Sequence, residues 1–134
     1  MKATVKWVED ELFLGTSPSG HTLMLDTNGG NLAPSPLENI LISLGCCSSV
    51  DVISILQKAR QDVTDCVVEV TGTRVDSVPK LFSDIHLHFI VTGKDIKEKH
   101  LIRAVALSAD KYCSVAQMLN AKVTITHDYA IIAG

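Results

Sequence analysis

The segment from Ser35 to Arg60 constrains the fold more than any other, because it predicts one long helix that is apolar around most of its circumference. Ser35 stands at the N-cap, Pro36 at the first helical position and Glu38 three residues after the cap, which together form a capping box. We expect the helix to run from Pro36 to about Arg60. Its apolar residues cover so many directions that it must be central rather than superficial: Ile40, Leu41, Leu44, Val50, Ile53, Ile55 and Leu56.

The other segments alternate in the manner of strands, apart from one second helix. A helix is expected from Asp95, with Glu98 three residues later, to about Leu119, and its apolar stripe includes Ile102, Val105, Ala109, Tyr112, Ala116 and Leu119. Strands are expected in a group of three before the first helix, a pair between the helices and one after them, including residues 3–8, 21–26, 66–75, 83–93 and 122–132.

This order, βββ-α-ββ-α-β, groups the strands and isolates the helices, which favours an α+β fold over a doubly wound sheet. Residues 1–134 fit a single domain. Two helices that are apolar nearly all round need cover on two sides, and one small sheet supplies only one. We therefore expect a homodimer in which the two helices pack between β-sheets.

The net charge and the cysteines of the chain limit the classes of function that it can have. The net charge of −3 gives no basic surface for nucleic acid or for a membrane. The N-terminal segment has no apolar core typical of a signal peptide, and polar residues interrupt the longest apolar run, so we expect a cytoplasmic protein. In that compartment the four cysteines are free by default, and any disulfide is transient, catalytic or redox-sensing.

Cys46 and Cys47 are adjacent in the first predicted helix, and Cys113 lies in the second. Neighbouring helical residues point about 100° apart, so at most one of the first two can face a given partner. Thiols on two crossing helices can reach disulfide distance, which is the geometry of a reactive and a resolving cysteine. Buried cysteines are also common as small apolar core residues, an alternative that stays open. No spacing supports a zinc site.

Two carboxylates accompany these cysteines. The capping box alone accounts for Glu38, although a carboxylate at a buried helix start can also orient a cation or a peroxide. Asp51 follows Cys47 by one helical turn among Val50 and Val52, and a carboxylate there needs a partner.

Two segments carry a resemblance to a known family: "APSPLENILISLGCCSSVDVISILQKARQDV", and some fifty residues later "LSADKYCSVAQML". Together with the order of elements over essentially the whole chain, they resemble the OsmC/Ohr family, and most closely the OsmC-like branch called YhfA-like. The resemblance implies an intertwined homodimer with two long central helices.

It also implies a thiol-dependent peroxidase that reduces organic hydroperoxides without haem, flavin or metal. By position, Cys47 would be the peroxidatic thiol and Cys113 the resolving thiol, with Cys46 a packing residue and Glu38 helping to order the site. A thiol reductant, of which a lipoylated protein is one type, would regenerate the pair. A non-catalytic small-molecule-binding protein and a redox sensor of the same fold are the alternatives.

The chain departs from the pattern of the characterised peroxidases at three places. Those proteins hold the reactive thiolate with an arginine from the N-terminal region, whereas here no arginine precedes Arg60 and Lys6 lacks the planar fork of arginine. Their glutamate directly follows the proline, whereas Leu37 intervenes here. Ser114 stands where their second motif has a proline.

Overall fold

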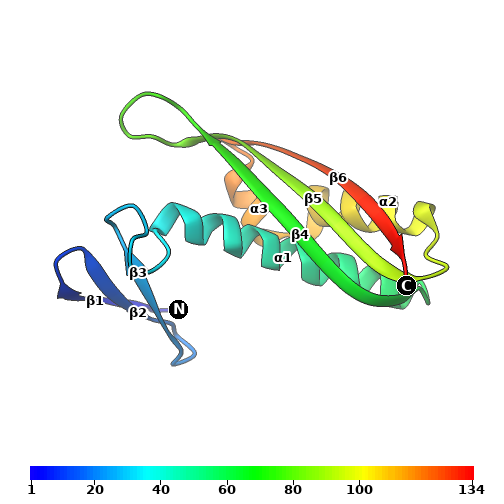
Figure 1. Ribbon diagram of the computed structural model, residues 1–134, viewed down its shortest axis with the longest axis horizontal. Helices are drawn as coiled ribbons and strands as arrows, with labels where there is room; N and C mark the ends of the chain where they lie inside the picture. Colours follow the sequence, from blue (N-terminus) through cyan, green and yellow to red (C-terminus); the bar gives the residue numbers. More distant parts are fainter. The chain divides into compact units, whose positions relative to one another are not determined.

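The computed structural model describes residues 1–134, which form two compact units, Met1–Ile40 and Leu41–Gly134 (Figure 1). The α+β class and the predicted βββ-α-ββ-α-β order are confirmed, with the second helix divided into three pieces. The elements in chain order are β1 (Thr4–Glu9), β2 (Leu12–Thr16), β3 (Thr22–Asp26), α1 (Pro36–Lys58), β4 (Asp62–Arg74), β5 (Phe82–Lys94), α2 (Glu98–Leu107), the π-helical segment η1 (Ser108–Tyr112), α3 (Ser114–Leu119) and β6 (Thr124–Ala133).

The N-terminal unit holds an antiparallel three-stranded sheet in the order β1-β2-β3, followed by the beginning of α1. The predicted capping box is present: the Ser35 amide donates to Glu38 Oε1 at 2.8 Å, and the Glu38 amide donates to Ser35 Oγ at 3.2 Å. These two bonds satisfy amides that have no partner within the helix, so they fix where α1 begins.

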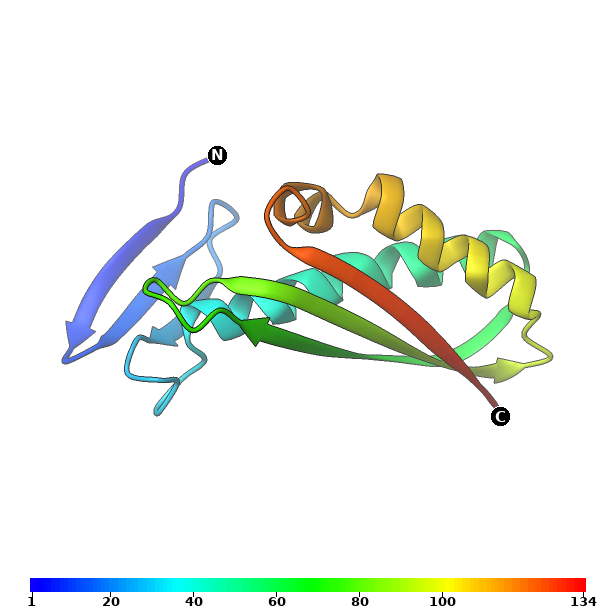
Figure 2. The same cartoon turned by 90° about the horizontal axis from the view of Figure 1, so that it is seen from above.

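The C-terminal unit contains a second three-stranded sheet in the order β4-β5-β6, in which β4 and β5 are antiparallel and β5 and β6 are parallel. Figure 2 shows the helices of this unit along one face of the sheet. Alternate β5 residues Ile85, Leu87, Phe89 and Val91 are buried and join the apolar core. His86 and His88 fall between them, and they therefore point to the other face.

Helix α1 contributes Leu44, Val52 and Leu56 to this core, each fully buried. Gly45 lets the helix approach the sheet closely, since a Cβ there would lie 3.0 Å from Val70 Cγ2. By length and composition alone α1 is long and apolar enough to cross a membrane, a test that core helices of folded domains also pass. Of the seven apolar residues from which a central helix was predicted, only Leu44 and Leu56 are buried and Val50 is exposed, so within this chain α1 is covered on one side only.

The second predicted helix differs from the expectation. It starts at Glu98 after Lys97, which makes no side-chain cap, so the capping box predicted at Asp95 is wrong. Instead of continuing to Leu119, it widens into η1 and breaks at Cys113, whose backbone is extended (φ −74°, ψ 106°). The predicted apolar stripe is confirmed only in part, because Val105 and Ala116 are buried whereas Ile102 and Tyr112 are exposed. Leu101 and Ala104, which the stripe did not include, are buried.

Candidate functional site

The structure brings together two of the predicted site residues, Cys47 of α1 and Cys113 at the start of α3. Both are free thiols, and Cys47 lies close enough to Cys113 to add to the effect of burial in raising the pKa of the Cys113 thiol. Cys113 is fully buried, whereas Cys47 is half-buried and packs against the apolar core. The pair therefore combines a protected sulfur with one that has a path to solvent.

The break between η1 and α3 determines how Cys113 is held. With its extended backbone, Cys113 is the N-cap of α3, and its Sγ accepts a hydrogen bond from the Ala116 amide at 3.4 Å. Ser48 Oγ donates a second bond to the same sulfur, also at 3.4 Å. Both donors stabilise a thiolate more than a thiol, because they place partial positive charge against the sulfur.

These effects on the Cys113 thiol oppose each other. Burial raises its pKa most, the hydrogen bonds from Ser48 and the Ala116 amide lower it, and the neighbouring Cys47 thiol raises it again. The net result is a pKa above the ordinary range for cysteine. Cys113 is therefore a protonated thiol near neutral pH, in contact with a second thiol that is more accessible.

Asp51 has the partner that its position requires. Ser108, which is buried in η1, donates from Oγ to Asp51 Oδ2 at 3.0 Å and lies 3.3 Å from the carbonyl oxygen of Ser48. This contact ties α1 to η1 one turn beyond Cys47. Asp51 is thereby bound to a hydroxyl group rather than left as an isolated charge beside the thiols.

The remaining cysteines lie outside the pair. Cys46 is exposed on α1, so its predicted role as a packing residue is not realised within this chain. Cys66 lies within β4, where burial and then the charge of Asp65 raise the pKa of its thiol. Neither residue has a thiol partner that would support disulfide exchange.

Glu38, the third predicted site residue, belongs to the N-terminal unit, where its carboxylate is used in the capping box. A Cβ at Gly30 would overlap Glu38 Oε1, and Gly30 has a φ of +73°, which favours glycine. The loop before α1 therefore has the backbone freedom that this carboxylate position needs. The geometry supports a structural role for Glu38 at the start of the helix.

Two cavities lie in the C-terminal unit. A cavity of about 10 Å³ borders Ser48 and Ser108, which is about the space for one water molecule. A much larger one, of about 680 Å³, is lined by α1 from Asp51 onward, by α2 and by Tyr112. Neither Cys47 nor Cys113 lines either cavity, and Cys47 is the partly exposed thiol, so a molecule that meets the pair must approach the half-buried side of Cys47.

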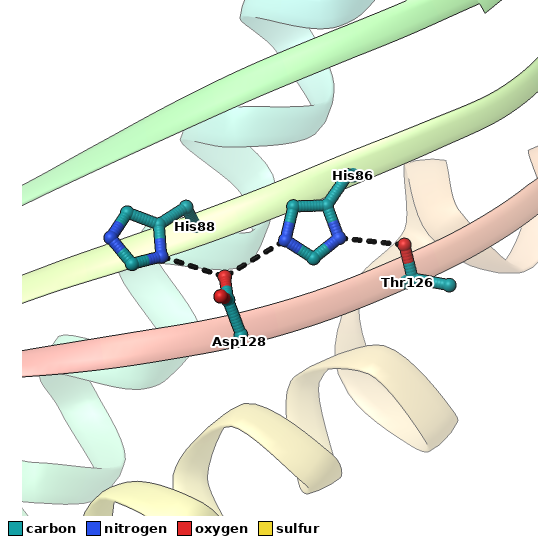
Figure 3. A network of polar contacts seen from close by, with 4 residues as sticks. All are labelled: His86, His88, Thr126 and Asp128. Carbon is teal, nitrogen blue, oxygen red and sulfur yellow. Dashed lines mark hydrogen bonds and ion pairs between the residues drawn. The ribbon is translucent and has the colours of Figure 1, made fainter.

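A second polar cluster lies on the opposite face of the sheet (Figure 3). His86 Nε2 and His88 Nδ1 contact the same oxygen, Asp128 Oδ1, at 2.8 and 2.6 Å, and His86 Nδ1 lies 2.7 Å from Thr126 Oγ1. The hydrogen bond from His88, followed by that from His86, lowers the pKa of Asp128. The four residues are at least partly exposed, and no group of side chains in the chain has the arrangement of a metal site.

The sequence interpretation missed both serines that organise the thiol pair. Ser48 directly follows Cys47, and Ser108 opens the segment that ends at Cys113, so both were within the segments that carried the resemblance. The signal that could have found Ser108 was the unexplained Asp51, which required a buried donor. Nothing in the local pattern indicated the π-helical segment that puts Ser108 in place.

Comparison with known proteins agrees with this architecture. The family model described as OsmC-like protein matches residues 29–128. Protein YhfA of Escherichia coli K12 is 56% identical over 133 residues, covering 99% of both chains. A hypothetical protein from Aquifex aeolicus is 30% identical with a TM-score of 0.89, covering 99% of this chain and 96% of that one.

The organic hydroperoxide resistance protein OhrB of Bacillus subtilis shares the fold. Its structure aligns with a TM-score of 0.66 at 15% identity and covers 96% of both chains. The family match spans most of the chain, and the similarity to Protein YhfA extends over nearly all of it. On this evidence, the chain belongs to the family of OsmC-like proteins.

Proposed function

We propose that the protein is a thiol-dependent peroxidase that reduces organic hydroperoxides with Cys47 and Cys113. The observation that carries this proposal is the contact between a half-exposed and a buried thiol. The fold shared with a protein of organic hydroperoxide resistance supports it.

Cys47 is the attacking residue in this scheme because it is the accessible member of the pair. Its thiolate attacks the terminal peroxide oxygen, so that an S–O bond forms, the O–O bond breaks and the alcohol leaves with a proton. Cys113 then attacks the sulfenic acid sulfur, the S–S bond forms, and water leaves. A small or protein-bound thiol returns the disulfide to two thiols by exchange.

Glu38 has a supporting part in this proposal. It fixes the start of the helix that carries Cys47, through the two hydrogen bonds with Ser35. No step of the scheme requires a metal or an organic cofactor. Cytoplasmic location is part of the same proposal, since the cycle needs a compartment in which thiols are kept reduced.

A homodimer is the proposed assembly. Large apolar side chains are exposed on α1, where Ile42 and Val50 are 58% and 60% exposed, and on β1, where Trp7 is 63% exposed. Met118 of α3 is exposed as well. A second copy would cover these side chains, and sedimentation equilibrium tests for it.

Peptide mapping by mass spectrometry tests the catalytic proposal. The reduced protein is mixed with one equivalent of cumene hydroperoxide, and in parallel with hydrogen peroxide. We expect rapid loss of two mass units located in a Cys47–Cys113 disulfide, faster with the organic peroxide. Cys47→Ser abolishes it, whereas the matched variant Cys46→Ser, at the exposed neighbouring thiol, leaves it intact.

The alternative is a non-catalytic binding or redox-sensing protein, and the large cavity is the observation that favours it, because Cys47 is not among its lining residues. Thiols that stay reduced for minutes after the peroxide is added contradict the peroxidase proposal and favour a binding protein. A disulfide that forms without turnover in the presence of a thiol reductant identifies a sensor.

A further inference from the structure

The large cavity of the C-terminal unit is distinct from the thiol pair and has a chemistry of its own. Its volume of about 680 Å³ falls within the range of small-molecule pockets. It begins at Asp51, one helical turn after Cys47, and continues past Lys58, with His100 and Arg103 supplied by α2. Ile55 and Leu107 provide apolar wall.

The charged groups of the cavity are unbalanced. Lys58 and Arg103 are two cations against a single carboxylate, Asp51, and His100 adds a ring nitrogen that can donate a hydrogen bond. The ion pairs of the structure both involve Asp128, so none of these three basic residues is neutralised by a carboxylate of the chain. Asp51 already accepts a hydrogen bond from Ser108. The cavity therefore offers unused donors to a negatively charged group.

Helix stability explains only one of the three basic residues. Lys58 lies in the last turn of α1, where a positive charge interacts favourably with the helix dipole. His100 lies in the first turn of α2, Glu98–Leu107, where the helix carries positive partial charge, and Arg103 is the sixth of its ten residues, outside the first and last turns. The helix dipole therefore gives no reason for a basic residue at either position.

We propose that this cavity binds an organic carboxylate that carries an apolar chain. The guanidinium group of Arg103 can hold a carboxylate through two parallel hydrogen bonds, Lys58 adds a second charge, and Ile55 and Leu107 contact the chain. Asp51 on the same wall repels a second negative charge, which disfavours phosphate. The inference does not depend on the thiols, because Cys47 does not line the cavity.

Isothermal titration of the full-length reduced protein with octanoate tests this proposal, with octan-1-ol as the neutral analogue and inorganic phosphate as the anion without a chain. We expect octanoate to bind and the other two to bind more weakly. Because the contacts are charged and partly exposed, the affinity should fall with added salt. Arg103→Gln should weaken octanoate binding by about tenfold.

Lys99→Gln is the matched control, since it removes the same charge from an exposed position of α2 outside the cavity. It should leave octanoate binding unchanged. Lys58→Gln gives a second test on a different helix if Arg103→Gln does not fold. Equal binding of octanoate and octan-1-ol, equal binding of octanoate and phosphate, or unchanged affinity in both cavity variants would overturn the proposal.

Cys47→Ser should bind octanoate as the unchanged protein does, so this experiment gives its answer whether or not the peroxidase proposal holds. If Arg103→Gln alters the association state and octanoate does not bind, the cavity receives part of a second copy instead. That result also overturns the proposal.

Discussion

The thiol cluster and the histidine cluster lie on opposite faces of the same three-stranded sheet, and they use similar groups in different surroundings. Cys113, Ser48 and Ser108 are each 4% exposed or less, and their polar atoms bond to one another. His86, His88 and Asp128 make shorter contacts, but Asp128 has 58% of its side chain exposed. Water can replace the bonds of the second cluster and not those of the first. Burial, rather than the length of a hydrogen bond, therefore determines how much that bond contributes to stability.

The largest effect on stability is expected in β5, where substitutions at two neighbouring residues should differ strongly in their cost. Leu87→Ala removes a side chain that is 3% exposed, and we expect it to lower the free energy of unfolding by about 2–5 kcal/mol. His88→Ala, one residue away on the other face, should change it by less than about 0.5 kcal/mol. Urea unfolding at one fixed protein concentration measures both. Equal losses would show that the outer face of the sheet is also packed.

A smaller effect on stability should distinguish the hydroxyl groups of Ser108 and Thr126. Ser108→Ala leaves Asp51 Oδ2 without its buried donor, and should cost about 1–3 kcal/mol of unfolding free energy. Thr126→Val removes the hydroxyl that contacts His86 on the exposed face, where water substitutes for it, and should cost less than about 0.5 kcal/mol. If Thr126→Val is the more destabilising of the two, the comparison is wrong.

The fold followed from the sequence because its signals are local and repeated. The capping box at Ser35 and Glu38 fixed the start of α1, and the alternation in β5 identified both the buried face and the outward histidines. These features depend on residues two to four positions apart, which a single sequence displays directly.

Only part of the candidate site could be predicted from the sequence, because its most important contacts join residues that are distant in the chain. The resemblance selected Cys47 and Cys113, which lie together, but η1 and the break at Cys113 have no equally clear local pattern. Ser108 reaches Asp51 across a sequence separation of 57 residues. Arg103 and Lys58 likewise meet around one cavity only after α2 has packed beside α1.

The variant Ser48→Ala tests how a buried hydrogen bond affects the chemistry of the thiol pair. This prediction rests on the proposed resolving role of Cys113. The hydrogen bond from Ser48 lowers the pKa of the Cys113 thiol, so its removal should raise that pKa further. The pH midpoint for formation of the Cys47–Cys113 disulfide should then move upward. Stopped-flow oxidation at a series of pH values measures the shift. Ser49→Ala, next in the chain and without a bond to the sulfur, is the control, and an equal shift in both variants contradicts this role of Ser48.

The smallest effect on stability is expected at Asp128, on the exposed face of the sheet. Because its contacts with His88 and His86 lower the pKa of Asp128 in the folded state, the stabilisation is fully present above the pKa of the unfolded chain and is lost as the pH falls through the folded value.

Asp128→Asn should therefore be slightly less stable than the unchanged protein at neutral pH, and the difference should vanish in acid, below the ordinary range for aspartate. Because most of the Asp128 side chain is exposed, added salt should shrink the difference at neutral pH. Unfolding curves measured from pH 7 to pH 2, with Asp84→Asn as an exposed aspartate on the same sheet for comparison, test this prediction. A large loss at neutral pH that salt does not reduce would mean that the histidine cluster is covered, and the natural candidate for its cover would be a second copy of the chain.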